Sequence, residues 1–251
     1  MAKYQFIRIQ TYALAATKSK RSFQDIMKEV VRENGHCRHV PDPQAPHFIH
    51  GDHPADMMKY IKSIPETCKD KLGRKIRKDA QLVISGVASY PYTVDQVRGE
   101  RKDHYLNWLR LTKQFLESKY GDNLRLIAQH ADEAYPHIHF FVTGDIDNGI
   151  YTIDNLHAGK KAMNAIPIER GVNGNGAKRQ AAYKQAMQDY QDDYYHAVAE
   201  PLGFKRDSGA LKRKRVTRQQ WHEGYHLHLQ DKASEKLSDA SYRPKPSNTI
   251  T

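Results

Sequence analysis

Residues 124–144 constrain this chain more than any other stretch, because two short apolar segments there flank a tight polar connection. In the second segment His137 and His139 share one face of a strand by the period of two, while apolar residues take the other face. Pro136 cannot donate a ladder hydrogen bond, so it suits the start of that strand. The pattern therefore predicts two strands paired as an antiparallel hairpin.

The predicted hairpin brings His130, at the end of its first strand, beside His137 and His139, with Asp132 and Glu133 in the connection. A single histidine in a strand is usually packed or solvated, but three of them beside two acids predict a divalent metal site. We expect the three histidines and Glu133 to bind the metal. We expect Asp132 to orient one of these histidines without binding the metal itself. Ligation dominated by imidazole suits Mn²⁺, with Mg²⁺, Zn²⁺ or Ni²⁺ as alternatives.

This segment also resembles a known family motif. The MobV-type plasmid mobilisation relaxases (the Mob/Pre family), which belong to the HUH endonucleases, carry the pattern H-x-D-E-x-x-P-H-x-H. Its fixed positions are all filled here, by His130, Asp132, Glu133, Pro136, His137 and His139. The resemblance extends over roughly residues 3–220 and is sharp only at 130–139.

The resemblance implies an α+β fold in which an antiparallel β-sheet carries the metal site and helices cover the other face. Residues 1–220 would form the nuclease domain, and residues 221–251 a C-terminal helix and flexible tail. The implied activity is a metal-dependent DNA relaxase that nicks one strand at a plasmid transfer origin by transesterification, with a covalent bond to the 5′ phosphate, for conjugative mobilisation.

Two alternatives stay open. A rolling-circle replication initiator or an HUH transposase would use the same metal motif on a different DNA substrate. A non-catalytic, basic DNA-binding regulator would carry the site as a structural or degenerate feature.

The nucleophile is where the chain departs from the family, whose members use a histidine in an H-x-x-R setting before an Asp-Pro loop. Counted back from the Asp42-Pro43 dipeptide, the corresponding segment runs from Glu29 to Arg32 and contains no histidine or tyrosine. His36 and His39 follow it and are candidate replacements, because an imidazole can form a phosphoramidate.

Two tyrosines are the other candidates. Tyr190 and Tyr194 are spaced Y-x-x-x-Y on a predicted helix after the metal strands, as in replication initiators. They also fit the apolar stripe of that helix, which predicts packing instead. We favour His39, followed by Tyr194.

Charge indicates the class of partner. Forty Lys and Arg residues against 29 Asp and Glu residues give a net charge of +11. That excess favours DNA, single-stranded or as an origin hairpin, with other mobilisation proteins as further candidates. A basic run is also what a solvated helix face looks like. The expected DNA contacts are Arg8, Arg74, Lys75, Arg77, Lys78, Lys212, Arg213, Lys214 and Arg215.

Cysteine content and apolar runs bear on location. Cys37 and Cys68 are the only cysteines, which fits a reducing compartment. The N-terminus lacks a signal-peptide core and no apolar run has the length of a membrane helix, so we expect a bacterial cytoplasmic protein. A second metal site from these cysteines with His36 and His39 is a minor option, because its spacing matches no standard zinc pattern.

Periodicity and capping signals predict the remaining elements. The glycine-rich residues 171–176 lack the Lys-Ser/Thr of a nucleotide-binding loop and are expected to be a linker. We expect strands at 4–12 and 82–88, and helices at 22–32, 54–80, 94–120, 152–166, 177–199 and 221–230.

Overall fold

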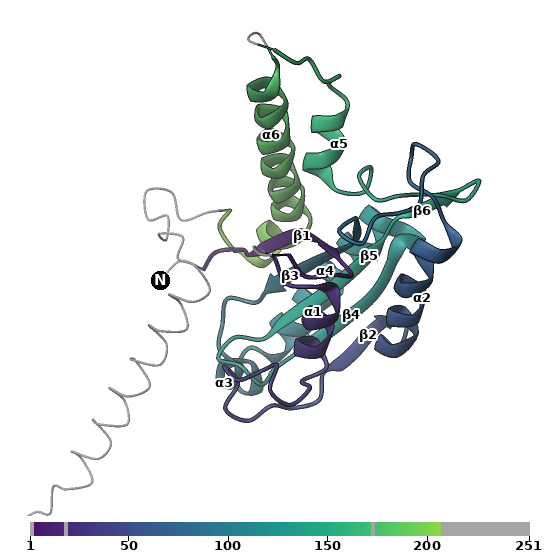
Figure 1. The fold of residues 1–251 in the computed structure, drawn as a ribbon. Helices are drawn as coiled ribbons and strands as arrows, with labels where there is room; N and C mark the ends of the chain where they lie inside the picture. The colour runs from purple at the N-terminus through teal and green to yellow at the C-terminus, as the bar shows by residue number, and fades with distance from the viewer. Residues whose placement is uncertain (1–2, 18–19, 172–173, 207–251) are drawn as a thin grey trace, which may run out of the picture. The chain divides into compact units, whose positions relative to one another are not determined.

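A five-stranded antiparallel sheet forms the centre of the computed structural model (Figure 1), which describes residues 3–17, 20–171 and 174–206. The strand order is β1-β3-β5-β4-β2, so the two histidine strands lie inside the sheet. The strands are β1 (Ile7–Ala13), β2 (His47–Gly51), β3 (Gln81–Ser89), β4 (Leu124–His130) and β5 (His137–Thr143), with a separate ribbon of β6 (Asp145–Asp147) and β7 (Ile150–Thr152). The predicted α+β class is confirmed.

Helices pack on both faces of the sheet. Three short helical turns accompany these helices, at Gly121–Asn123 after α4, and at Tyr195–Ala199 and Glu200–Leu202 after α6. The α-helices are α1 (Phe23–Val30), α2 (Pro54–Thr67), α3 (Val94–Arg98), α4 (Lys102–Tyr120), α5 (Ala158–Asn164) and α6 (Gly176–Tyr194). In Figure 1, α5 and α6 lie side by side and point away from the sheet.

The strand register assigns each helix to a face. His130 pairs with His137, so their side chains leave the same side, which we call the histidine face. The helix α1 covers part of that face, where Phe23 meets Phe141 edge to face at 5.7 Å between ring centroids. Gln129, next to His130 in the strand, points the opposite way and donates from Nε2 to the Tyr105 hydroxyl of α4 at 3.0 Å. We call this opposite side, packed against α4, the core face.

Several predicted boundaries differ from the observed ones. The helix expected at 54–80 ends at Thr67, because Cys68 is extended and a turn around Asp70, which accepts from the Arg74 backbone N–H, follows. The helix expected at 94–120 is divided at Gly99 into α3 and α4. The strand β2 lies in a segment expected to be loop. The helix expected at 152–166 is present but shorter, as α5, and Thr152 instead ends β7.

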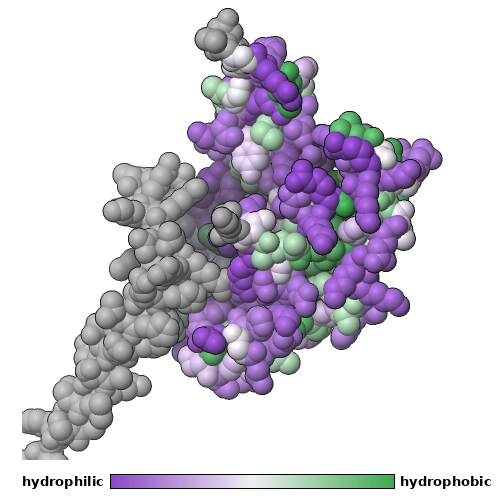
Figure 2. All heavy atoms as spheres, viewed as in Figure 1, coloured by the Kyte–Doolittle hydropathy of each residue, from purple (hydrophilic) through white to green (hydrophobic). Residues whose placement is uncertain are grey.

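The surface of this part of the chain is polar. In the view of Figure 2 hydrophilic residues dominate the described surface. Across the described residues, no helix combines the length and the apolar content that crossing a bilayer requires. The helix expected at 221–230 and the tail lie outside the described residues.

Candidate metal centre

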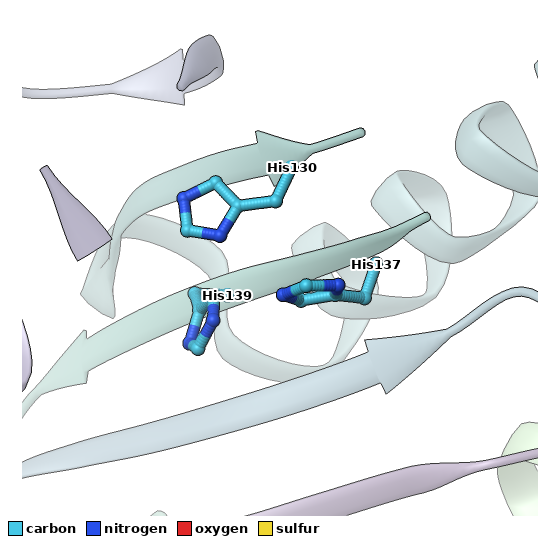
Figure 3. Close-up of side chains that lie close together, drawn as sticks. All are labelled: His130, His137 and His139. Atoms are coloured by element: carbon cyan, nitrogen blue, oxygen red, sulfur yellow. The ribbon is translucent and has the colours of Figure 1, made fainter. Parts of the chain in front are cut away.

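The β4–β5 hairpin brings the three predicted histidines together. His130 stands opposite His137, and His139 stands one pair further along, opposite Ala128. The ring centroids are 5.1 Å apart for His130 and His137, 5.0 Å for His130 and His139, and 5.2 Å for His137 and His139. Each ring contributes one nitrogen, and these three nitrogens all lie within 4.8 Å of one another (Figure 3).

Backbone carbonyls orient two of these rings. The Nε2–H of His130 donates to the Val30 carbonyl at the end of α1 (2.9 Å), and the Nδ1–H of His137 donates to the Tyr135 carbonyl (3.1 Å). The Nδ1 atoms of His130 and His139 are buried and have no hydrogen-bond partner among the described residues. Buried polar atoms are normally satisfied. Two orphaned lone pairs beside a third imidazole therefore fit a bound cation.

The surroundings keep the imidazoles of His130 and His139 neutral. Burial lowers the pKa of His130 to about 4, and the charges of Arg32 and His137 act in the same direction. Burial and the neighbouring histidines also lower the pKa of His139 well below its usual value. A neutral imidazole offers a lone pair to a metal, whereas a protonated one does not.

Arg32 clamps the two acids of the connection. Its Nε and Nη2 donate to the two carboxylate oxygens of Asp132 at 2.8 and 2.6 Å, and Nη2 also donates to Glu133 Oε1 at 2.9 Å. The side chains of Arg32 and Asp132 are 3% and 1% exposed. Arg32 follows α1 with a positive φ of 60°, a strained conformation that persists only where surrounding contacts impose it.

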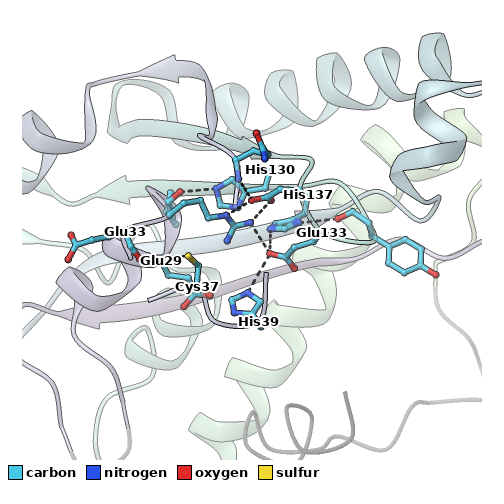
Figure 4. A network of polar contacts seen from close by, with 12 residues as sticks. Glu29, Glu33, Cys37, His39, His130, Glu133 and His137 are labelled. Atoms are coloured by element: carbon cyan, nitrogen blue, oxygen red, sulfur yellow. Dashed lines mark hydrogen bonds and ion pairs between the residues drawn. The ribbon is translucent and has the colours of Figure 1, made fainter. Parts of the chain in front are cut away.

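Glu133 lies between this clamp and the histidines. Its Oε1 is 3.7 Å from His137 Nε2 and 3.5 Å from His39 Nε2 (Figure 4). Burial by itself would raise the pKa of Glu133, but the hydrogen bond with His39 and the charges of His137 and Arg32 lower it to about 2. Glu133 is therefore a carboxylate at neutral pH.

Asp132 bonds to partners other than the histidines. Its oxygens accept from Arg32 and from the backbone N–H of Gln44 (3.1 Å), and among the described residues it bonds to no imidazole. Its carboxylate still lies near His130, since ligand atoms of His130, Asp132 and Glu133 are within 4.8 Å of one another, so a role in orienting a histidine stays a prediction. Asp132 fixes Arg32 and the loop after the Asp42-Pro43 dipeptide.

The two loop histidines occupy different places. The side chain of His39 is 10% exposed and lies at the centre through its contact with Glu133. His36 is 30% exposed and faces Glu33 at 3.8 Å. Within the described residues His36, Cys37, His39 and Cys68 form no ligand group, so the minor option of a second metal site is wrong.

The two candidate tyrosines are core residues. Tyr194 accepts from Trp108 Nε1 and bonds to Thr112 Oγ1, both at 3.1 Å and both on α4. Tyr190 bonds to the Tyr120 hydroxyl at 3.2 Å. Each is 1% exposed, and burial raises the pKa of Tyr194 to about 12 and that of Tyr190 well above its usual value. The sheet separates both from the histidine face, so the structure argues against either as nucleophile.

Glu29 stands where the resemblance to the family would place the nucleophile. Its carboxylate forms an ion pair with Arg21 and its side chain is 15% exposed. The spacing Glu29-x-x-Arg32 was visible in the sequence, but the partners of Arg32 were not, because they lie 100 and 101 residues further along the chain.

The expected DNA contacts fall in three regions. Arg8 is exposed on the histidine face, since it pairs with Val87, which pairs with His139. Arg74, Lys75, Arg77 and Lys78 precede β3, at the end of the sheet opposite to the histidines, with Arg74 bonded to Asp70 and Arg77 to Asp79. Residues 212–215 lie outside the described part.

Comparison with known proteins decides the family. Residues 1–223 match the family model Mob_Pre, described as plasmid recombination enzyme. The chain belongs to the Mob_Pre family. It is 27% identical over 208 residues to plasmid recombination enzyme type 3 of Mammaliicoccus lentus, covering 77% of this chain and 49% of that protein. The type 1 enzyme of Staphylococcus aureus is 27% identical over 156 residues, covering 55% of this chain and 37% of that protein. The chain thus spans about half the length of the type 3 relative and a smaller share of the type 1 relative.

A solved structure of the same family supports the fold. The MobM relaxase domain, described as Mn-bound and bound to a 22-nucleotide plasmid pMV158 oriT DNA, superposes with a TM-score of 0.54 at 17% identity. The match covers 88% of this chain and 99% of that one. The fold of this Mob_Pre chain is therefore that of a relaxase domain.

Stability of the metal-free protein should fall as the pH drops from about 6.5 to about 4. The unfolded chain binds protons on His130 in this window while the folded chain does not, so folding opposes protonation there. Urea unfolding in EDTA across this range should show a smaller pH dependence for His130→Asn than for the unchanged protein. His157, whose pKa burial also lowers to about 4, retains part of the dependence. Equal dependence in both proteins would contradict the assignment.

Removing the clamp should strongly destabilise the protein. In Arg32→Ala the buried Asp132 loses its counter-charge, which costs about 3–5 kcal/mol of unfolding free energy. Arg74→Ala is the matched control, because it removes a similar Arg–Asp contact from an exposed position and should change stability little. Chemical denaturation of both variants at pH 7 measures the difference, and comparable losses would show that burial of the clamp is unimportant.

Proposed function

We propose that this chain is a plasmid-mobilisation relaxase that nicks one DNA strand at a transfer origin by transesterification. The observation that carries the proposal is the arrangement of three histidines, an ionised Glu133 and His39 on one side of the sheet. Membership of the Mob_Pre family and the Mn-bound, oriT-bound MobM relaxase domain support it. The plasmid-linked family favours a plasmid origin over a transposon end.

The three histidines would hold the metal, with Glu133 close enough to join them. The orphaned nitrogens of His130 and His139 and the Nε2 of His137 supply the lone pairs. Mn²⁺ is the ion we propose, as in the related MobM domain. When bound, such an ion draws charge from the non-bridging oxygens of the scissile phosphate.

His39 is the nucleophile we propose. A nitrogen of its imidazole would attack the phosphorus and form a P–N bond, while the bond from phosphorus to the 3′ oxygen breaks. The 3′ oxygen would leave as a hydroxyl after taking up a proton from solvent water, and Glu133, 3.5 Å from His39 Nε2, would accept the proton that the imidazole gives up. The 5′ phosphate would stay on the protein, ready for rejoining.

Loss of one metal-binding histidine should abolish nicking. In His137→Ala or His139→Ala, one of three imidazoles is missing, so Mn²⁺ affinity should fall by about tenfold or more. Binding to double-stranded DNA should change little. Isothermal titration with Mn²⁺ and nicking of a supercoiled origin plasmid are the measurements.

His196→Ala is the matched control, because His196 is exposed in the helical turn Tyr195–Ala199 that follows α6. It should nick and bind Mn²⁺ like the unchanged protein. Full nicking by His137→Ala and His139→Ala would remove the site. A protein that binds origin DNA but never nicks it would instead favour the regulator.

The covalent adduct should identify the nucleophile. His39→Ala should form no protein–DNA adduct, whereas His36→Ala, changed three residues earlier in the same loop, should form it normally. The adduct should survive alkali and fall apart in acid, as a P–N bond does. Adduct from His39→Ala, or an adduct stable in acid, would contradict a histidine at this position.

A further inference from the structure

The exposed aromatic residues of the described part of the chain lie at positions next to the strands or turn of the metal centre. In that part of the chain the Phe, Tyr and Trp side chains classed as exposed are Phe6, Phe48 and Tyr135, at 47%, 37% and 49% exposure. Aromatic rings otherwise contribute to a core in which Trp108 and Tyr90 are fully buried. Rings left in water around one site suggest that a ligand covers them.

The backbone of each of these three residues neighbours the histidine cluster, through the sheet or through its turn. The Phe6 carbonyl accepts from the Ser89 backbone N–H (3.1 Å), and Ser89 pairs with His137. Phe48 pairs with Ala128, which is opposite His139.

Tyr135 lies in the turn before β5, and its carbonyl holds His137. The ring of Phe48 already has a neighbour, the His53 ring, at 6.3 Å between centroids.

The edge strand β1 and the residue before it offer both a ring and a cation. Phe6, Arg8 and Gln10 alternate with the buried Ile7 and Ile9, and all three are exposed. We call these three exposed residues the β1 strip. Adjacent strands lie about 4.8 Å apart, so Phe6 and Arg8 stand about 10 Å from the backbones of His137 and His139.

The space between the strip and the histidines is lined by short side chains. Ser89 separates Phe6 from His137, and Val87 separates Arg8 from His139. A chain of phosphates and bases crossing from the metal to the sheet edge would meet Arg8 and Phe6 next.

We infer that the β1 strip is a binding site for single-stranded DNA next to the scissile phosphate. One base stacks on the Phe6 ring, and Arg8 contacts a neighbouring phosphate. This inference rests on the proposed function for its placement beside the cut. Double-stranded DNA is the less suitable occupant, because its paired bases hide the faces that stack on a protein ring.

The test measures binding without catalysis, by fluorescence anisotropy of the full chain in EDTA. The probes are a 20-nucleotide oligothymidylate and a deoxyribose-phosphate chain of equal length without bases. Phe6→Ala should bind the oligothymidylate about tenfold more weakly and the base-free chain unchanged. Phe6→Leu, which keeps an apolar side chain but no ring, should behave like Phe6→Ala.

Arg8→Gln should weaken binding to both probes and reduce the slope of log affinity against log salt by about 0.7. Ile146→Ala is the matched control, since Ile146 is 48% exposed on β6, away from the histidine face. It should bind both probes like the unchanged protein.

Two results would overturn the inference: unchanged oligothymidylate binding by Phe6→Ala, or an equal loss in Ile146→Ala. Since no metal is present, the outcome is separate from nicking. If the unchanged protein nicks DNA while Phe6→Ala loses no affinity, the β1 strip fails and the relaxase stands. If Phe6→Ala loses base-dependent affinity and the unchanged protein does not nick DNA, the β1 strip stands and the proposed relaxase activity fails.

Discussion

The buried ion pair between Arg32 and Asp132 is the interaction on which the centre depends. Two charges removed from water cost several kcal/mol in desolvation, and here that cost is offset by a bidentate contact and a backbone N–H from Gln44. The same guanidinium holds Glu133 and helps to keep His130 neutral. One side chain thus ties the end of α1 to the turn between the two histidine strands.

The histidine cluster could be predicted because its geometry is local. Residues 130–139 form one hairpin, and the period of two in β5 places His137 and His139 on the same face without knowledge of the rest of the fold. The same alternation in β1 placed Arg8 on one face, although the identity of that face as the histidine face required the register through Val87. Family membership followed from the same hairpin, and the wider match confirmed it.

Features set by distant contacts could not be predicted in the same way. Arg32 meets Asp132 across 100 residues, and the loop that brings His39 to Glu133 has no periodic pattern. Tyr194 fitted two hypotheses, nucleophile and core, and its burial against α4 on the far side of the sheet decides for the core. The basic run at 74–78 looked helical by composition, but the turn at Asp70 places it in a loop at the opposite end of β3 from the histidines.

The central claim is that the three imidazoles form a single metal centre. Crystals of the full chain grown with Mn²⁺ and measured at the manganese absorption edge test it most directly. The account predicts one strong anomalous peak enclosed by His130, His137 and His139, with Glu133 beside it. A peak elsewhere, or none at saturating Mn²⁺ with the three rings still in place, would contradict it.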